Sequence, residues 1–497
     1  MRIAASPPLI PRLPIERNPG LPLHRQVYEA LRQAILGGTL RPGQRVPSTR
    51  ALATELEISR FPVLAAYEQL LHEGYLEGRV GSGTYVCAAP PERSLQAVRN
   101  GPRDKRASSA RRSALSDARR ARRNEIPRAR DEGGLRPFRA SLPALDQFPH
   151  VLWSRIVARH AHRLSPSQMV YGDPAGLGEL RAAIAEHLRT ARAVRCEAEH
   201  VLIVSGSQAA LRLCATVLLG RGEPVAIEEP SYSGARAALL ATGAELVPVP
   251  VDDEGIDVRA LGALGSRVRA VYVTPSHQHP LGMCMSATRR LALLDWAVRN
   301  DAWIFEDDYD SEYRYVSRPL GALQGMDTAD RVVYVGTFSK VLFPALRIGY
   351  LVVPPQLWNA FVEAREALDV FSPTLYQLAL TDFLREGHFV RHLRRMRGVY
   401  MKRRQALLDA IDMHCRGVLT VYNADAGLHL ATLLPNDVND VDVVKRMADR
   451  RLIATALSTC YIGRARRNGL LLGFGGTDEA TLTAATRTLG EVLRERA

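Results

Sequence analysis

The stretch that decides the fold is VGTFSKVLFPALRIGY, residues 335–350. An apolar run leads straight into small hydroxyl-bearing residues and ends in Lys340. A lysine at the end of a buried strand is partly withdrawn from water, which lowers its pKa and makes its amine a nucleophile toward an aldehyde. Arg347 adds a permanent cation that suits a phosphate. An isolated lysine after a strand is usually a solvated surface residue, but this combination predicts a reactive lysine beside an anion-binding turn.

The sequence around this stretch alternates apolar runs with amphipathic patterns. Patterns with helical spacing, at 208–219 and 287–299, separate runs that are typical of strands. These runs are 201–204, 224–227, 270–273, 303–305 and 332–335. The alternation predicts an α/β fold with a mostly parallel sheet over residues 138–497.

A second strand end, WIFEDDY at 303–309, supplies acids and a phenol. The cofactor pyridoxal 5′-phosphate (PLP) needs a carboxylate at its pyridine nitrogen, because that partner keeps the ring protonated and able to accept electrons. It also benefits from a hydroxyl at its phenolate oxygen. Asp307 and Tyr309 have these chemical types. The acids could instead form a solvated loop or a metal site, but no matching His or Cys pattern occurs, so we expect no metal.

A third strand end, SGSQA at 205–209, precedes a predicted helix. Small residues let backbone N–H groups and the helix N-terminus face an anion. Such turns are common, so this one alone is a weak indication of an anion site. It supports the prediction because it occurs in order with the other two strand ends.

The N-terminal part predicts a separate small domain. Leu23, Val27, Leu31 and Ile35 recur every four residues and therefore share one helix face, which Gly37 and Gly38 end. Two further helices would begin at the N-caps Ser48 and Ser59, the second running to about His72. Two extended runs, 75–77 and 84–86, flank a glycine-rich turn and predict a β-hairpin. Together these elements predict a winged helix-turn-helix over residues 18–88.

The charge distribution separates the two domains. The chain has 497 residues and a net charge of +14, with much of the excess in 87–136. This stretch has almost no apolar periodicity and predicts a flexible basic linker over residues 89–137, whose charge would also suit a polyanion such as DNA. The six cysteines show no C-x-x-C spacing, and no long apolar run occurs. We therefore expect a cytoplasmic protein with reduced thiols, no zinc site and no membrane span.

Residues 22–87 resemble the DNA-binding domain of the GntR superfamily. The resemblance is carried by PGQRVPSTR (42–50), Ser59-Arg60, EGYL (73–76) and GSGTYV (81–86). It implies that the third helix enters the major groove of DNA and that the wing lies near the minor groove. Pro62 replaces the usual threonine, which removes one possible hydroxyl contact. The implied DNA-binding residues are Arg45, Ser48, Arg50, Ser59, Arg60 and Arg79.

Residues 138–490 resemble the fold-type I aminotransferases, through the three strand ends together with YGDPAG (171–176), EPSY (229–232) and TPSHQ (274–278). The two domains together resemble the MocR branch of the GntR regulators, which implies a head-to-tail homodimer. The resemblance makes Lys340 the Schiff-base lysine and places Asp307 at the pyridine nitrogen and Tyr309 at the phenolate oxygen. It implies that Tyr232 stacks on the cofactor ring and that Tyr171 reaches the phosphate of the other subunit. The implied phosphate ligands are Ser207, Gln208, Thr337, Ser339 and Arg347.

Two departures from aminotransferases bear on function. His279 stands where those enzymes carry an asparagine beside the ring, which changes the hydrogen bond to the ring oxygen. Their carboxylate-binding arginine has no evident counterpart, although Arg464, Arg466 and Arg467 lie in the corresponding segment. The regulator that senses γ-aminobutyrate carries an arginine two residues after the stacking tyrosine, where this chain has Gly234.

Two functions remain open from the sequence. One is a transcription regulator of vitamin B6 or amino-compound metabolism that binds operator DNA and senses PLP or an amino compound through aldimine formation at Lys340. The other is an active PLP-dependent aminotransferase with an accessory DNA-binding domain, because Lys340, Asp307 and Tyr309 are all present. Turnover of an amino acid with a keto acid discriminates between them.

Overall fold

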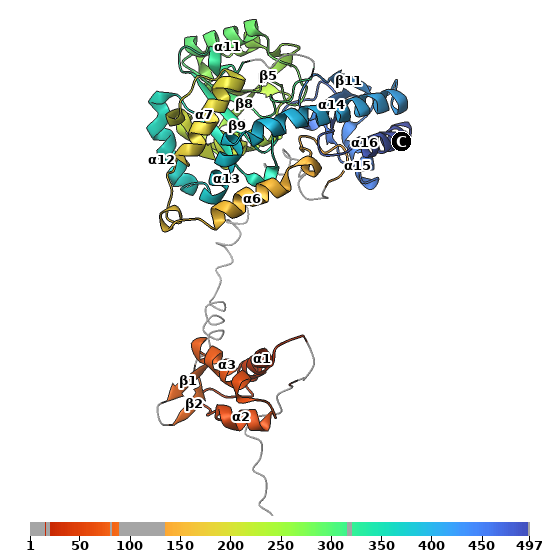
Figure 1. Cartoon of the computed structure of the whole chain (residues 1–497). Coiled ribbons are helices and arrows are strands. Elements are labelled where there is room, and N and C mark those ends of the chain that lie inside the picture. The colour runs from red at the N-terminus through yellow and green to blue at the C-terminus, as the bar shows by residue number, and fades with distance from the viewer. Residues whose placement is uncertain (1–14, 16–19, 80–81, 89–134, 316–320, 496–497) are drawn as a thin grey trace, which may run out of the picture. The chain divides into compact units, whose positions relative to one another are not determined.

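The computed structural model describes residues 15, 20–79, 82–88, 135–315 and 321–495. The chain divides into two compact units, Met1–Arg119 and Arg120–Ala497, each of which is described by itself (Figure 1). Residues 89–134 of the predicted linker lie outside the described residues. Within the described part, no helix combines the length and the apolar character that a membrane crossing needs.

The smaller unit has the predicted winged helix-turn-helix order. It contains α1 (Leu23–Leu36), α2 (Thr49–Glu55), α3 (Arg60–His72), β1 (Leu76–Arg79) and β2 (Gly83–Val86). The predicted helix face is confirmed, because Val27, Leu31 and Ile35 are buried in the core of this unit. Ser48 caps α2 by accepting a hydrogen bond from the backbone N–H of Ala51 at 3.2 Å. Ser59 occupies the N-cap position of α3 but makes no side-chain capping bond to the described backbone.

The larger unit is built on an eight-stranded sheet in the order β3-β10-β9-β8-β7-β4-β5-β6. Its strands β4, β5, β7, β8 and β9 pair in parallel, whereas β10 runs antiparallel between β3 and β9. The mostly parallel sheet predicted from the sequence is therefore confirmed. The strands are β3 (Val201–Val204), β4 (Pro224–Glu229), β5 (Glu245–Asp252), β6 (Gly255–Ile256), β7 (Ala270–Val273), β8 (Trp303–Asp308), β9 (Val332–Thr337) and β10 (Gly349–Val352).

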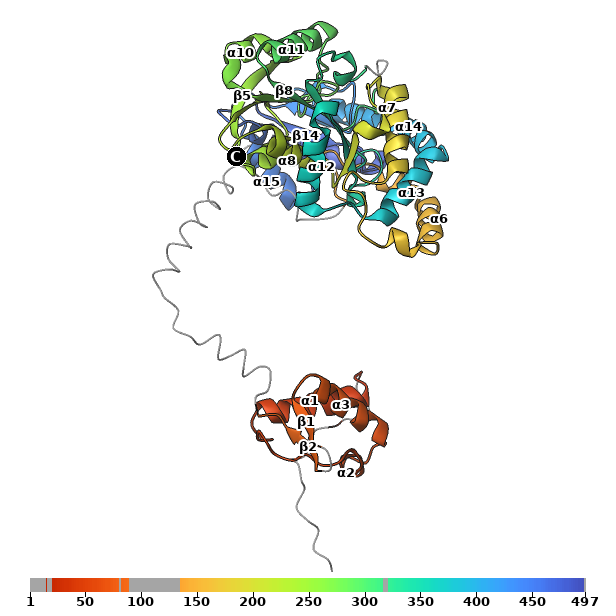
Figure 2. The same ribbon diagram turned by 90° about the vertical axis from the view of Figure 1, so that its left-hand side faces the viewer.

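Helices cover both faces of this sheet. On β4, Val225 and Ile227 pack in the cluster that includes α8 and α9, while the intervening Ala226 packs in the cluster that includes α11. Helices α6 and α13 lie side by side in both views (Figure 1, Figure 2). The helices are α6 (His150–Ala161), α7 (Gly178–Arg192), α8 (Ser207–Leu218), α9 (Ser233–Leu240), α10 (Val258–Gly262), α11 (Ala287–Arg299), α12 (Trp358–Asp369), α13 (Thr374–Arg385), α14 (His388–His414), α15 (Asp440–Asp449) and α16 (Glu479–Arg494).

A second, antiparallel sheet near the C-terminus was not predicted. Its order is β11-β12-β14-β13, and its strands are β11 (Thr420–Asn423), β12 (His429–Leu433), β13 (Thr455–Ala456) and β14 (Gly469–Gly473). The backbone before α6 joins this sheet, since Phe138 bridges Gly473 and Pro137 accepts a hydrogen bond from the Ile453 N–H at 3.1 Å. The last residues of the predicted linker, 135–137, therefore belong with the larger unit.

A buried ion pair ties the end of α7 to the end of β8. Arg192 donates to Asp308 at 2.9 Å and to the Ser276 hydroxyl at 2.8 Å, and the Tyr334 hydroxyl donates to Asp308 at 2.6 Å. Both charged side chains are almost fully excluded from water. Removing one partner of such a pair leaves an uncompensated buried charge, which costs several kcal/mol.

We expect Arg192→Met to lower the free energy of unfolding of the larger unit by about 3–5 kcal/mol, because Asp308 loses its buried counter-ion. Urea unfolding followed by tryptophan fluorescence measures this, since Trp153, Trp296, Trp303 and Trp358 all lie in that unit. The exposed pair of Arg299 and Asp295 is the control, and Arg299→Met is expected to change stability by less than about 1 kcal/mol. Equal effects of the two substitutions would contradict the prediction.

Candidate cofactor site and DNA interface

A cavity of about 620 Å³ in the larger unit gathers the predicted cofactor-binding side chains. It is lined from the ends of β8 and β9, the start of α8, and the turns before α9 and β10. Of the predicted residues, those that line it are Lys340, Asp307, Tyr309, Tyr232, Ser207, Gln208, Thr337, Ser339, Arg347 and His279. The motifs are far apart in the sequence. They meet in one site because the carboxyl ends of the parallel strands lie at the same edge of the sheet.

Lys340 lies just after β9 and lines the cavity. Burial lowers the pKa of its ammonium, Asp310 and Asp307 oppose that shift, and Arg139 and Arg347 reinforce it. A lowered pKa raises the fraction of neutral amine at a given pH, and the neutral amine is the form that attacks a carbonyl. The local electrostatics therefore suit a nucleophilic role for this lysine.

Asp307 lines the same cavity and has a buried oxygen without a hydrogen-bond partner among the described residues. Its Oδ2 accepts a hydrogen bond from the Tyr272 hydroxyl at 2.9 Å, whereas its buried Oδ1 has no partner among the described residues. Burial is the largest cause that raises the pKa of this carboxyl to about 7. A buried acceptor without a donor is costly, so the site fits a ligand that brings an N–H, as a protonated pyridine does.

The part of the cavity at the start of α8 allows an anion to come close to the backbone. Gly206 precedes α8 with a φ of +93°, and a Cβ there would lie 3.0 Å from the Arg347 guanidinium. Helix α8 has no side-chain N-cap in the described structure, so its first N–H groups, from Ser207 onward, are available to a ligand. Arg347 is held by a hydrogen bond to the Ser205 carbonyl. These features fit a phosphate at the start of α8.

A hydrogen-bonded chain behind the cavity fixes Tyr309. Its hydroxyl donates to the carbonyl of His277 at 3.0 Å, and the His277 ring lies 2.9 Å from the Asp310 carboxylate. The hydroxyl has a single proton, so it can donate to an acceptor oxygen in the cavity by turning that proton away from the His277 carbonyl. His277 was absent from the sequence-based site because it lies behind the cavity wall, a position that only the fold specifies.

His279 lines the cavity as a neutral ring. Burial, together with the nearby rings of His429 and His277, lowers the pKa of His279 well below its usual value. Its ring stands edge-on to Tyr232, with 5.4 Å between the ring centroids. A neutral imidazole carries one N–H donor and one acceptor nitrogen. It can therefore serve a ring oxygen as a donor, as an asparagine amide does.

The arginines considered for a carboxylate lie away from the cavity. Arg464 and Arg466 are exposed, and the Arg467 guanidinium lies over the Tyr422 ring at 4.5 Å. From the segment 457–475, the described side chains that line the cavity are Cys460 and Leu471. The cavity does contain Arg139, which the sequence reasoning missed because it lies beside the predicted linker.

A residue larger than glycine at position 234 would displace the Tyr232 ring. A Cβ built there would lie 2.3 Å from that ring, so an arginine at 234 would require the ring to take another position. Arg236 does not substitute for it, since it donates to the carbonyls of Tyr461 and Thr459 at 2.9 and 2.7 Å. The departure from the γ-aminobutyrate-sensing pattern is therefore built into the packing around Tyr232.

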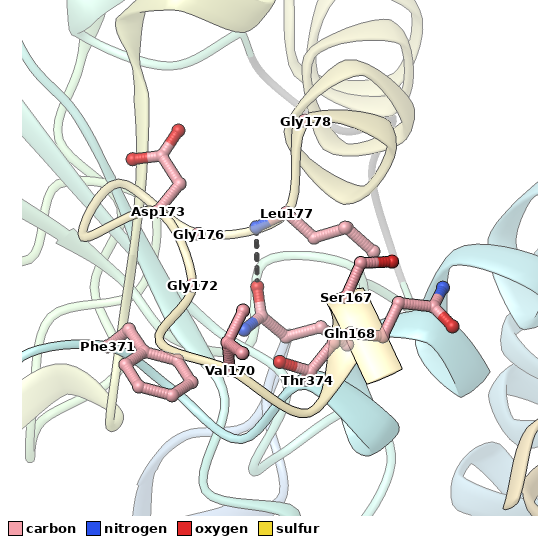
Figure 3. A pocket seen from close by; sticks show the side chains of 11 residues that line it. Ser167, Gln168, Val170, Gly172, Asp173, Gly176, Leu177, Gly178, Phe371 and Thr374 are labelled. Atoms are coloured by element: carbon pink, nitrogen blue, oxygen red, sulfur yellow. Dashed lines mark hydrogen bonds between the residues drawn. The ribbon is translucent and has the colours of Figure 1, made fainter. Parts of the chain in front are cut away.

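Tyr171 is the predicted cofactor residue that does not line the cavity of the described structure. Its side chain is 84% exposed and its ring stands edge-on to Phe371 at 6.2 Å. Neighbouring residues line a small pocket in which the Leu177 N–H donates to Gln377 at 2.8 Å (Figure 3). Met169 and Val170 beside it are also exposed. Tyr171 thus belongs to an outward-facing apolar segment.

The predicted DNA-binding residues form two groups on the smaller unit. Arg60 donates to the Thr49 hydroxyl at 3.2 Å, so the N-termini of α2 and α3 lie together and present Ser48, Arg50, Ser59 and Arg60. In the wing, Arg79 pairs with Glu77 at 2.6 Å and lies over the Tyr85 ring. The backbone of Tyr85 forms an isolated antiparallel β-bridge with Arg45. All six side chains are exposed. Phe61, which the sequence analysis did not select, is 77% exposed on α3.

Comparisons with known proteins agree with both units. Residues 145–488 match the family model for class I and II aminotransferases, and residues 23–86 match the model for bacterial regulatory proteins of the gntR family. The chain is 39% identical to the probable rhizopine catabolism regulatory protein MocR of Rhizobium meliloti, over 96% of this chain and 95% of that protein. It is 34% identical to the HTH-type pyridoxine biosynthesis transcriptional regulator PdxR of Corynebacterium glutamicum, over 95% and 96% of the two chains.

A solved structure with a similar fold is the α-aminoadipate aminotransferase LysN of Thermus thermophilus, complexed with N-(5′-phosphopyridoxyl)-L-leucine. The TM-score is 0.67 and the identity is 30%, over 72% of this chain and 91% of that chain. The match covers most of the enzyme, so the larger unit has the aminotransferase fold.

Proposed function

The chain belongs to the MocR-type branch of the GntR regulators, in which a winged helix-turn-helix precedes an aminotransferase-like domain, and from this premise we propose that its DNA binding responds to PLP held on Lys340. The effector is PLP itself or an amino compound that reacts at the same site. The regulated genes would serve vitamin B6 or amino-compound metabolism, and the protein would act in the cytoplasm. The observation that carries the proposal is that Asp307 Oδ1 has no hydrogen-bond partner among the described residues, while Asp307 lines the same cavity as Lys340.

Each side chain has a distinct part in this proposal. PLP, when bound, supplies an aldehyde that condenses with primary amines and a pyridine ring that withdraws electrons. The neutral amine of Lys340 is the group that attaches, and Asp307 Oδ1 accepts a hydrogen bond and keeps a proton on its partner. Arg347 and the first N–H groups of α8 bind the phosphate. Tyr309 and His279 present hydroxyl and imidazole groups to a ring oxygen.

A second copy of the chain is expected to complete the site. The exposed segment of Met169, Val170 and Tyr171 offers apolar surface beside a phenol, a combination that suits a subunit interface. In a head-to-tail dimer, Tyr171 would reach the phosphate of the partner's cavity. Two winged helices would then be available for a repeated operator.

The DNA contacts divide by chemistry. Arg50, Arg60, Ser48 and Ser59 at the adjoining N-termini of α2 and α3 suit base edges and phosphates in the major groove. Arg45 and Arg79 on the wing suit phosphates and the minor groove. Breaking the pair of Arg79 with Glu77 costs little, because both side chains are solvated.

Phe61 is expected to read thymine. Apolar side chains on a recognition helix contact the thymine methyl group, and Phe61 follows Arg60 with most of its ring in solvent. We expect Phe61→Ala to weaken binding to a specific operator by about 1–2 kcal/mol, or roughly five- to thirtyfold. Fluorescence anisotropy with operator fragments that carry uracil in place of single thymines measures the contact.

The wild type should lose affinity at one or more uracil positions, and Phe61→Ala should lose that sensitivity. Leu71→Ala is the control, since Leu71 is exposed at the other end of α3. A Phe61→Ala variant that is as sensitive to uracil as the wild type would rule out the contact.

The alternative function is an active aminotransferase, which the joint presence of Lys340, Asp307 and Tyr309 in one cavity favours. The test is to incubate the PLP-loaded protein with amino acids and 2-oxoglutarate and to measure glutamate per protein. We expect less than one equivalent, together with PLP-dependent binding to DNA upstream of the protein's own gene. Many equivalents of glutamate without an effect of PLP on DNA binding would support the alternative and refute the regulator proposal.

A further inference from the structure

The backbone of residues 137–142, here called the strap, forms one wall of the cavity. Its members Arg139, Ala140, Ser141 and Leu142 all line the cavity. The strap is fixed to the second sheet, because Phe138 accepts a hydrogen bond from the Gly473 N–H at 2.8 Å. A Cβ at Gly473 would lie 2.0 Å from the Arg139 carbonyl oxygen, so a glycine is needed where the two backbones meet. Arg139 therefore projects from a firmly held segment.

The strap has an unfavourable backbone conformation on both sides of Arg139. Phe138 and Ser141 have φ angles of +69° and +59°, in the left-handed region that residues other than glycine rarely adopt. Such a conformation is strained and persists when surrounding contacts impose it. Such residues are often found at ligand sites. Here they flank Arg139, which lines the cavity.

Arg139 is separate from the cation that serves the phosphate. The charged side chains that line the cavity in the described structure are Arg139, Lys340, Arg347 and Asp307. Arg347 is held at the Ser205 carbonyl and beside Gly206, at the start of α8. The charge of Arg139 lies close enough to Lys340 to contribute to the lowered pKa of its ammonium. The cavity thus contains an arginine in addition to the one at the start of α8.

The wall around Arg139 is apolar. Leu142 and Leu145 contribute from the strap and the turn after it, and Leu471 contributes from β14. An arginine beside leucines suits a ligand that has one anionic group and an apolar body, because the guanidinium binds a carboxylate through two hydrogen bonds.

We propose that Arg139 binds the carboxylate of an amino acid effector, whose amine faces Lys340 and whose apolar side chain lies against Leu142, Leu145 and Leu471. The proposal rests on the proposed function, because the effector must enter a cavity that already holds PLP. It assigns the effector class and replaces the C-terminal arginines as the carboxylate ligand.

The experiment is isothermal titration calorimetry on the full-length, PLP-loaded protein. The probes are L-valine, L-leucine and L-phenylalanine, each paired with the amine that lacks its carboxylate: isobutylamine, 3-methylbutylamine and 2-phenylethylamine. For at least one pair, the wild type should bind the amino acid about 10- to 100-fold more tightly than the amine, because a charged hydrogen-bonded pair contributes that much. Arg139→Gln should abolish this preference and leave the affinity for the amine unchanged.

Two further variants make the result specific. Arg464→Gln removes an exposed arginine of the C-terminal segment and should keep the wild-type preference. Arg139→Lys retains the charge but lacks the planar group that forms two parallel hydrogen bonds. It should reduce the affinity for the amino acid less than Arg139→Gln does, and it should leave the affinity for the amine unchanged. It also decides the matter if the glutamine variant does not fold, as judged by tryptophan fluorescence.

Several results would overturn the assignment. One is a preference for the amino acid over its amine that survives in Arg139→Gln, and another is loss of that preference in Arg464→Gln. The others are an equal loss of affinity for amino acid and amine in Arg139→Lys, and no binding of any probe amino acid. Loss of PLP from Arg139→Gln would instead make Arg139 a cofactor ligand and would also overturn it. Failure of the wild type to retain PLP, or to bind DNA upstream of its gene, would refute the proposed function itself and is read out separately.

Discussion

Lys340→Ala is expected to abolish the covalent retention of PLP and to weaken its binding by more than about tenfold, because the bond to the lysine amine is lost while the phosphate contacts remain. The visible absorption of the bound cofactor should disappear after dialysis. Borohydride treatment of the wild type, followed by peptide mass spectrometry, should place a phosphopyridoxyl group on Lys340.

The exposed Lys445, which pairs with Asp442, provides the matched control. Lys445→Ala should retain the visible absorption and the modified peptide in full. A visible band that persists in Lys340→Ala, or a label on another lysine, would show that the reactive amine lies elsewhere.

Arg60→Ala is expected to reduce the affinity for a specific operator by about 1–3 kcal/mol, or roughly 5- to 150-fold, if the guanidinium contacts a base edge. Affinity for an unrelated DNA fragment of equal length should fall much less. The measurement is fluorescence anisotropy with both fragments at several salt concentrations. Removal of a single phosphate contact would instead reduce the slope of log affinity against log salt concentration by about one. It would weaken binding to both fragments alike.

The control for charge is Arg299→Ala, which removes an exposed arginine from α11 of the larger unit. It should leave the ratio of specific to unrelated affinity unchanged. If Arg60→Ala also leaves that ratio unchanged, α3 does not read sequence through this residue.

Local patterns predicted much of the fold. The helix at 287–299 and the strands at 201–204 and 270–273 begin and end as expected, because apolar runs and capping residues specify them locally. Most of the residues predicted to bind the cofactor line one cavity, since they follow apolar runs near strand ends. Parallel strands then bring these ends together.

The parts that were missed depend on contacts between distant segments. β13 has two residues and β11 is only partly buried, so neither has a strong periodic signal. Arg139 lies next to an arginine-rich stretch, where one more arginine has no distinguishing feature. Its place in the cavity wall depends on the backbone pairing of Phe138 with Gly473, more than three hundred positions away in the sequence. His277 was missed for the same reason.

The central claim is that the state of the Lys340 site controls DNA binding. The most direct test is to measure binding to the DNA upstream of the protein's own gene, with and without PLP, for the wild type and Lys340→Ala. We predict that PLP changes the wild-type affinity by about fivefold or more, which is the lower range of coupling between two sites, and leaves the variant unchanged. The same PLP response in both proteins, or no specific binding by the wild type at any salt concentration, would contradict the account.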